Sequence, residues 1–224
     1  MLESNPFSFW CEKMPENELN HWEYQNEIVQ KSDEFQQAEM LFQSNQHDKA
    51  VEYYKMYVER NKEKMSPHSL RSAFVRLGKI LSQQAKYQEA LDYHFQCVEI
   101  NVALCGEDSV EVAVDYMAIG SVLNELGQYK KALDCPQKAL TTFNACCGEN
   151  DIPLATCADY IGDVFKNKKN DKVALQCYIK SMKIHQAIYG ENHFEMTNCY
   201  GRIGMSYYRL EEYDEALSSI SRKL

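Results

Sequence analysis

GEDSVEVA at residues 106–113 recurs as GENDIPLA at 148–155 and as GENHFEMT at 190–197, so that successive copies begin 42 residues apart. Two further series, one of glycines and one of alanines, keep the same interval: Gly78, Gly120, Gly162 and Gly204, and Ala90, Ala132, Ala174 and Ala216. Self-similarity at a fixed period of this size is the signature of a repeat architecture. The chain is therefore predicted to be a row of similar units.

Each unit is predicted to contain two amphipathic helices, because apolar residues recur at helical spacing in two separate stripes. The first stripe of one unit is Tyr116, Ile119, Gly120 and Leu123, and the second is Tyr129, Ala132, Leu133, Ala139, Leu140 and Phe143. Residues suited to helix N-caps precede the first helices, namely Ser66, Ser109, Asp151 and His193. Glycines suited to a left-handed C-cap follow the second helices: Gly106, Gly148 and Gly190.

These landmarks resemble the tetratricopeptide repeat, whose first helix carries aromatic, Leu, Gly and aromatic residues and whose second carries an alternation of aromatic residues and Ala. The family's usual period is about 34 residues, and the 42-residue period resembles the kinesin light chain and nephrocystin-like subtype. The resemblance implies an all-α fold, a right-handed α-solenoid of antiparallel helix pairs. Pro136 departs from the pattern, since it stands at an aromatic position inside a helix and removes a backbone hydrogen bond there.

The resemblance also gives the predicted boundaries. A non-repeat acidic leader covers residues 1–31, and the solenoid covers 32–224. Within the solenoid we expect one degenerate repeat at 32–65, full repeats at 66–106, 107–148 and 149–190, and a truncated repeat at 191–224.

Composition excludes several classes of protein. Of 224 residues, 24 are Lys or Arg and 33 are Asp or Glu, which gives a net charge of −9 and disfavours binding to nucleic acid or to an anionic membrane surface. A hydrophobic fraction of 45% can form a sizeable core. No apolar run reaches the roughly 18 residues of a membrane span, and the amino terminus lacks the basic region of a signal peptide. The simplest expected compartment is the cytoplasm.

The nine cysteines suggest a metal site at first sight, since Cys146 and Cys147 are adjacent and Cys97 lies three residues after His94. However, six of the nine form pairs exactly one period apart: Cys105 with Cys147, Cys135 with Cys177, and Cys157 with Cys199. Equivalent repeat positions lie far apart along a solenoid, so a packing role is favoured over a metal or redox site. We expect no metal and no cofactor.

No catalytic sequence motif is found. Asp159 and Asp163 lie four residues apart on a predicted first helix, where they could form an acid–base pair or a charged lining. Because no nucleophile accompanies them, the lining is favoured and the protein is predicted not to be an enzyme.

The resemblance implies that first helices line a concave face that holds an extended peptide or a helix of a partner protein. Carried over by position, the predicted lining is Val75, Lys79, Met117, Ser121, Asp159, Asp163, Arg202 and Met205. The Lys, Asn and Arg that clamp a terminal carboxylate in chaperone-binding members are missing, as are the paired Asn of kinesin light chains. The predicted groove is mixed apolar and acidic, which suits a helix or strand with Leu or Met anchors and a few Lys or Arg.

Both ends of the chain carry predictions of their own. The leader holds Phe7, Phe9, Trp10 and Trp22 among acidic residues, which suits either a docking tail or a lid on the first repeat. The last repeat stops inside its second helix at Leu224, so we expect an apolar end face that is covered by a neighbouring subunit or by a continuation of the natural chain.

These features together predict a non-catalytic scaffold or adaptor within a larger cytoplasmic assembly. The resemblance to kinesin light chains suggests microtubules, and the nephrocystin-like similarity suggests a cilium or axoneme. The alternative is a regulatory module that binds a short peptide or helix transiently, which includes cargo recognition of the kinesin light chain kind.

Overall fold

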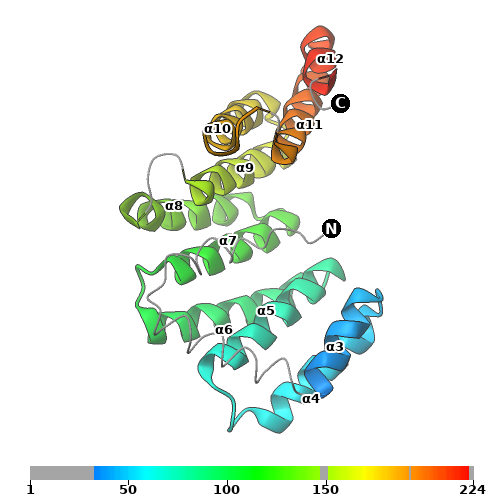
Figure 1. Ribbon diagram of the computed structural model, residues 1–224, viewed down its shortest axis with the longest axis vertical. Helices are drawn as coiled ribbons and strands as arrows, with labels where there is room; N and C mark the ends of the chain where they lie inside the picture. The colour runs from blue at the N-terminus through cyan, green and yellow to red at the C-terminus, as the bar shows by residue number, and fades with distance from the viewer. Residues whose placement is uncertain (1–32, 147–150, 192, 222–224) are drawn as a thin grey trace. The chain divides into compact units, whose positions relative to one another are not determined.

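The computed structural model describes residues 33–146, 151–191 and 193–221 (Figure 1). Within them the chain forms ten α-helices in sequential antiparallel pairs and no strand, so the predicted all-α class is confirmed. None of these described helices is long and apolar enough to cross a bilayer. The pairs are α3 (Asp33–Gln43) with α4 (His47–Asn61), α5 (Pro67–Gln83) with α6 (Tyr87–Cys105), α7 (Val110–Glu125) with α8 (Tyr129–Cys146), α9 (Ile152–Asn167) with α10 (Asp171–Tyr189), and α11 (Phe194–Arg209) with α12 (Tyr213–Ser221).

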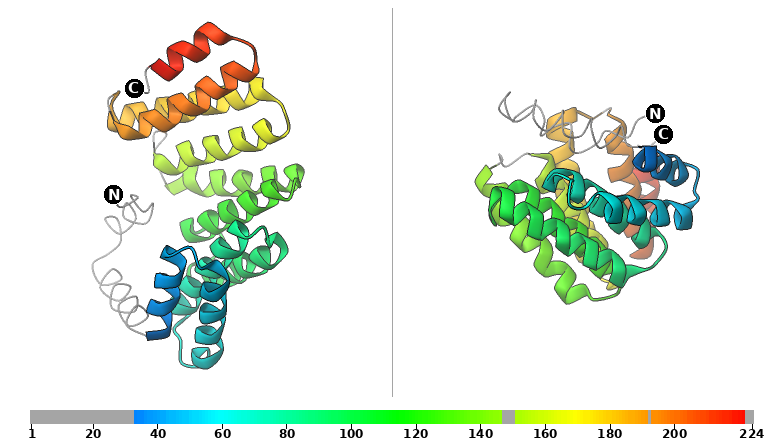
Figure 2. Two further views of the ribbon diagram at one scale, coloured as in Figure 1. Left: turned by 90° about the vertical axis from the view of Figure 1, so that its right-hand side faces the viewer. Right: turned by 90° about the horizontal axis from the view of Figure 1, so that it is seen from below.

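The chain divides into two compact units, Met1–Ile100 and Asn101–Leu224, and the division falls inside α6. In the second unit, helices α7 to α12 lie side by side in chain order, as the views in Figures 1 and 2 show. Each helix in this unit therefore packs mainly against its neighbours in sequence, as in other repeat proteins.

The helix boundaries follow local side-chain chemistry. Ser66 Oγ accepts a hydrogen bond from Ser69 N at 3.2 Å, and Ser109 Oγ accepts one from Val112 N at 3.4 Å. His193 precedes α11, and its Nδ1 accepts from Glu195 N at 3.4 Å, which confirms the predicted capping role. At the other helix ends, Gly106 and Gly190 have φ of +86° and +80°, a conformation that glycine adopts without a Cβ clash. The third predicted C-cap, Gly148, lies outside the described residues.

Glycine in the first helix allows a ring from the second helix to pack against its backbone. A Cβ at Gly162 would lie 2.6 Å from Tyr178 Cε1, and a Cβ at Gly78 would lie 2.7 Å from His94 Nε2. Both distances are too short for real carbon contacts, so any larger residue would force the two helices apart. The repeated alanines of the second helices are also buried, which confirms that these small residues serve close helix packing: Ala90, Ala132, Ala174 and Ala216.

Pro136 lies within α8, and its missing N–H leaves the Ala132 carbonyl without its helical donor. The hydroxyl of Tyr160, on α9, donates to this carbonyl at 3.0 Å. The same hydroxyl lies 2.7 Å from the point where a Cβ on Gly120 would be. It therefore occupies beside Gly120 the space that the Tyr178 ring occupies beside Gly162 in the next repeat. The following helix pair thus compensates for the proline, a partnership that the sequence analysis did not identify.

Four cysteines are buried as small packing groups, namely Cys97, Cys135, Cys157 and Cys199. Burial raises the pKa of the Cys135 and Cys199 thiols to about 11 and that of Cys157 to about 12, so these thiols stay neutral at physiological pH. Cys105 and Cys146 are exposed instead. Across the described residues, no three His, Cys, Asp or Glu side chains gather in a way that could hold a metal ion.

Tyr160→Phe is expected to destabilise the second unit by about 1–3 kcal/mol, because the carbonyl of Ala132 then loses the hydroxyl that replaces its helical donor in a partly buried site. In a Pro136→Ala background the residue at 136 has an N–H again, so the same substitution should cost clearly less. Urea unfolding followed by circular dichroism measures both values. Tyr116→Phe serves as the matched control, since the Tyr116 hydroxyl meets the exposed amine of Lys138 at 3.4 Å. Equal costs in the two backgrounds would contradict the compensation.

His94 gives the first unit a pH-dependent stability. Burial lowers the pKa of this histidine from 6.5 to about 4, with a further lowering by Arg71. The unfolded chain therefore takes up the proton first, so stability is unaffected above pH 6.5 and falls as the pH drops from 6.5 towards 4, by up to about 3 kcal/mol. Urea unfolding between pH 7 and about pH 4 should show a shallower decline for His94→Gln than for the original chain. Parallel declines would show that other groups account for the loss.

Candidate functional site

A concavity of about 560 Å³ lies between α9, α10 and α11 in the second unit. Helical spacing brings its lining together: Asp159 and Lys166 are two turns apart on α9, while Asn198, Arg202, Met205 and Arg209 follow one another at three- and four-residue intervals on α11. The complete lining is Asp159, Lys166, Tyr178, Glu195, Asn198, Gly201, Arg202, Met205, Ser206 and Arg209. This is a mostly polar surface with one exposed apolar side chain, Met205.

The charges in the concavity are separated along the helices. The two acids of the lining, Asp159 and Glu195, lie in the N-terminal halves of α9 and α11. The three bases, Lys166, Arg202 and Arg209, lie in the C-terminal halves of the same helices. Asp159 and Arg202 lie next to the midpoints of their helices and attract each other, so the ends of the concavity are distinguished by Glu195 on one side and by Lys166 and Arg209 on the other.

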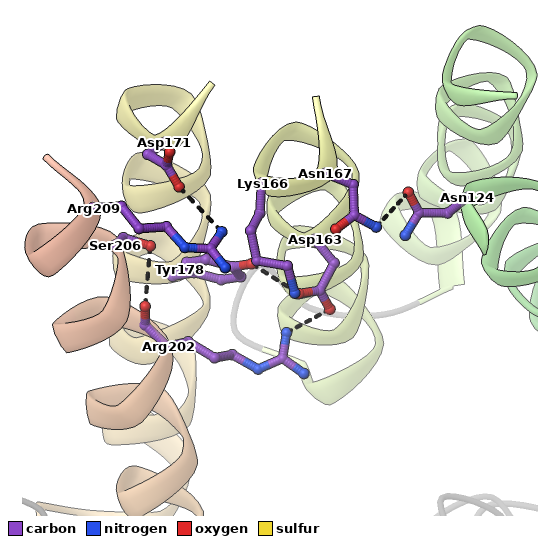
Figure 3. A network of polar contacts seen from close by, with 9 residues as sticks. All are labelled: Asn124, Asp163, Lys166, Asn167, Asp171, Tyr178, Arg202, Ser206 and Arg209. Carbon is purple, nitrogen blue, oxygen red and sulfur yellow. Dashed lines mark hydrogen bonds and ion pairs between the residues drawn. The ribbon is translucent and has the colours of Figure 1, made fainter. Parts of the chain in front are cut away.

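Beside the concavity, Asp163 is the centre of a network that joins three helices (Figure 3). Its Oδ1 accepts hydrogen bonds at 2.8 Å from both Lys166 Nζ and the Tyr178 hydroxyl. Its Oδ2 accepts one at 2.6 Å from a guanidinium nitrogen of Arg202, and this guanidinium also lies 5.6 Å from the centre of the Tyr178 ring. The carboxylate thus connects α9 to α10 and α11.

The two aspartates predicted as lining differ in their electrostatics. Burial would raise the pKa of Asp163, but Lys166, Arg202 and Tyr178 together outweigh burial and hold that pKa below its usual value. Burial raises the pKa of Asp159, although Arg202, Ser181 and His185 each act to lower it. Asp163 is therefore a paired structural carboxylate, whereas Asp159 is a partly buried acid of the lining.

Two weaker contacts extend the network. Arg209 lies 3.5 Å from Asp171 Oδ1, an ion pair across α10 and α11. Asn167 Nδ2 donates to Asn124 Oδ1 at 3.2 Å and so connects α9 to α7 (Figure 3). The side chains of Arg202 and Arg209 remain 40% and 43% exposed despite these contacts, so both can still reach a ligand.

The first unit contains the same arrangement at equivalent repeat positions. The hydroxyl of Tyr54 donates to Glu39 Oε1, and Arg76 Nε lies 2.8 Å from the same oxygen. In both units the acid stands on a first helix fifteen residues before the tyrosine, and the arginine comes from the next first helix. This spacing of acid and tyrosine is the sequence signal from which the network could have been predicted, and the sequence analysis missed it.

The structure brings together part of the predicted lining. Asp159, Arg202 and Met205 line the concavity, and Asp163 contacts Arg202 at its edge. The other charged lining residues were not among the predicted ones: Lys166, Glu195 and Arg209.

The remaining predicted residues lie elsewhere. Met117, on α7, packs in an apolar cluster, with its sulfur 3.6 Å from Cys157 Sγ, and Ser121 is exposed on the same helix. Val75 and Lys79 belong to the first unit, where Lys79 Nζ lies 5.8 Å from the centre of the Phe42 ring. The predicted docking residues lie outside the described part of the chain: Phe7, Phe9, Trp10 and Trp22.

A family model described as tetratricopeptide repeat matches residues 69–145 and 154–220. These ranges contain most of α5 to α12 and the whole of the concavity. No curated protein matches the chain in sequence.

Solved structures with the same fold include three at low sequence identity. BtubC (BKLC) from P. vanneervenii has a TM-score of 0.68 at 17% identity, with 83% of this chain and 75% of that chain covered. A candidate kinesin light chain from Podospora anserina, built of nearly identical TPR-like repeats, has a TM-score of 0.67 at 13% identity, with coverages of 85% and 91%. A Rap protein complexed with Competence and Sporulation Factor has a TM-score of 0.69 at 14% identity, with coverages of 85% and 52%. At these identities the likeness establishes the fold, a solenoid of repeated helix pairs.

Asp163→Asn is expected to lower the free energy of unfolding by about 1–3 kcal/mol, because Arg202 and Lys166 lose the charge that pairs them. Since the pKa of Asp163 lies below its unfolded value of 3.8, this stabilisation is present above pH 3.8 and is lost as the pH falls below it. Urea unfolding at neutral pH measures the cost. Asp134→Asn, which changes an exposed acid on α8, is the control and should cost little. Equal costs for the two variants would contradict a role for the network in stability.

Proposed function

Because the chain belongs to the tetratricopeptide repeat family, whose repeats form protein–protein interaction domains, we propose that it is a non-catalytic scaffold or adaptor that binds a partner segment in the concavity of α9, α10 and α11. The single observation that carries this proposal is the lining of the concavity. It combines partly exposed cations, two acids and an apolar side chain, Met205, which is 52% exposed. Repeat folds of this kind are typically non-catalytic.

The charge separation defines the chemistry of the partner segment. An acidic residue on the partner suits the end with Lys166 and Arg209, with Arg202 within reach, and a basic residue suits the end with Glu195. Between them, an apolar residue of the partner can pack against Met205. The proposed partner is therefore a short helix or extended segment with separated charges around an apolar anchor.

We propose a cytoskeletal assembly, microtubule-associated or axonemal, as the setting of this adaptor. The 42-residue period supports this setting, as do the kinesin light chain names of two structural neighbours. The alternative is a regulatory module that holds its ligand transiently, and the neighbour complexed with Competence and Sporulation Factor favours it. The lifetime of the complex separates the two, since an assembly subunit stays bound whereas a regulatory module exchanges.

A photo-crosslinking residue at Met205 is expected to capture a partner in cells of the source organism. The matched site is Met40 on α3, which is 61% exposed and lies outside the concavity. Partners captured only from Met205 are identified by mass spectrometry and purified. Asn198→Arg combined with Met205→Glu should then weaken binding of the purified partner at least tenfold, because one change adds bulk and the other removes the apolar anchor.

A partner whose affinity is unchanged by this double variant, or which is captured equally from Met40, would contradict the proposed site. The thermal unfolding midpoint of the variant serves as the folding control, since both changed residues are exposed. Arg202 is left unaltered in this test because it also pairs with Asp163.

A further inference from the structure

The contact between α9 and α10 contains polar side chains at positions that are apolar in the preceding repeat. One period earlier, Met117, Ala139 and Phe143 belong to one hydrophobic cluster. The corresponding positions in the α9–α10 pair are polar: Asp159, Ser181 and His185. Ser181 is completely buried and His185 is 9% exposed. Packing alone does not explain this change, because the burial of polar groups costs free energy.

His185 has a buried nitrogen that could take up a proton. Within the described residues, its Nδ1 has no hydrogen-bond partner. The ring of Tyr189 stacks on the imidazole, with ring centres 6.0 Å apart and planes 14° apart. The charge of His185 also acts on Asp159 across the contact of α9 with α10. A proton on the imidazole would therefore meet an aromatic face and a carboxylate, and both favour a cation.

Other charged and titratable groups surround His185 and Asp159. They lie on α9, on α11 and in the turn before α11: Asp163, Glu195, Cys199, Arg202 and His193. Arg202 attracts Asp159 and repels a charged His185, but its guanidinium is hydrogen-bonded to Asp163. The Cys199 thiol stays neutral, because burial raises its pKa to about 11. Asp159 is the carboxyl group on which the charge of His185 acts.

We infer that His185 and Asp159 form a proton-dependent pair that sets the charge of the concavity. With a neutral His185, Asp159 presents its negative charge to the lining and attracts Arg202. With a protonated His185, the imidazolium pairs with Asp159, and Arg202 turns more easily towards a ligand. Histidine is the side chain whose charge ordinarily changes between about pH 5 and pH 8, so the pair suits a response to physiological pH.

This pair would regulate the proposed binding site, so its consequence for a partner rests on the proposed function. The charged lining of the concavity consists of three bases and two acids. A proton on His185 adds one positive charge next to this lining. An acidic partner segment should therefore bind more tightly as the pH falls, and a basic segment should bind more weakly.

An NMR titration of the free full chain from about pH 8 to about pH 5.5 tests the pair without a partner. The imidazole signals of His185 are assigned by their loss in His185→Gln. Asp159→Asn should lower the midpoint of the His185 titration by about one pH unit or more, because the imidazolium loses its carboxylate and keeps the repulsion of Arg202. Asp171→Asn removes an acid at the other end of α10, so this matched control should leave the midpoint unchanged.

A reciprocal measurement keeps the test valid where Asp159→Asn fails to fold. In the original chain, the carboxyl carbon signal of Asp159 and the Nε–H signal of Arg202 should change with the same midpoint as the His185 imidazole. In His185→Gln both signals should stay nearly constant over this range. The inference would be overturned by equal His185 midpoints with and without Asp159, or by signals of Asp159 and Arg202 that still change in His185→Gln. Because the titration uses the free chain, neither result depends on whether the concavity binds a partner.

Discussion

The structure depends on how closely the two helices of a pair approach each other. In the α9–α10 pair, the ring of Tyr178 packs against the backbone of Gly162, because that position has no Cβ to hold the ring away. This approach brings the Tyr178 hydroxyl within 2.8 Å of Asp163, and Asp163 in turn binds Arg202 of the next pair. One glycine therefore fixes the spacing within a pair and, through the tyrosine, also the connection to the following pair. The geometry of the concavity depends on the spacing within the pair and on the connection to the next pair, since α9 and α11 supply most of its lining.

Different side chains fill the space beside the first-helix glycine in successive repeats, and these side chains differ in their chemistry. His94 packs on Gly78 and stays neutral because burial disfavours its charge. Pro136 supplies no aromatic ring, and the Tyr160 hydroxyl from the next pair fills the space and donates to the Ala132 carbonyl. The repeat period thus preserves the packing volume rather than the residue type. Stability in such a chain depends on nearest-neighbour contacts, so each of these replacements affects its own junction.

Features with a local cause could be predicted from the sequence. The helix pairs follow from apolar spacing, and the caps at Ser66, Ser109 and His193 follow from side chains that reach their own backbone. In the Asp163 network, the spacing of acid and tyrosine recurs in the sequence, but the pairing with Arg202, 39 residues away, depends on the packing of three helices and could not be predicted from a local pattern. For the same reason the lining was predicted only in part: positions on a first helix were transferable from the family pattern, but the charges that meet across α9 and α11 were not.

The hydrogen bonds to Asp163 determine how readily Arg202 can turn towards the proposed partner. Lys166 and Tyr178 both donate to Oδ1 of Asp163, whereas Arg202 donates to Oδ2. A partner carboxylate that draws Arg202 away therefore leaves Asp163 with two donors, so the cost is smaller than breaking a buried pair with no other contact. Arg209 is held less tightly still, at 3.5 Å from Asp171. Two arginines that serve as structural contacts in the free chain can thus turn towards a ligand, and this arrangement favours an acidic residue at that end of the partner segment.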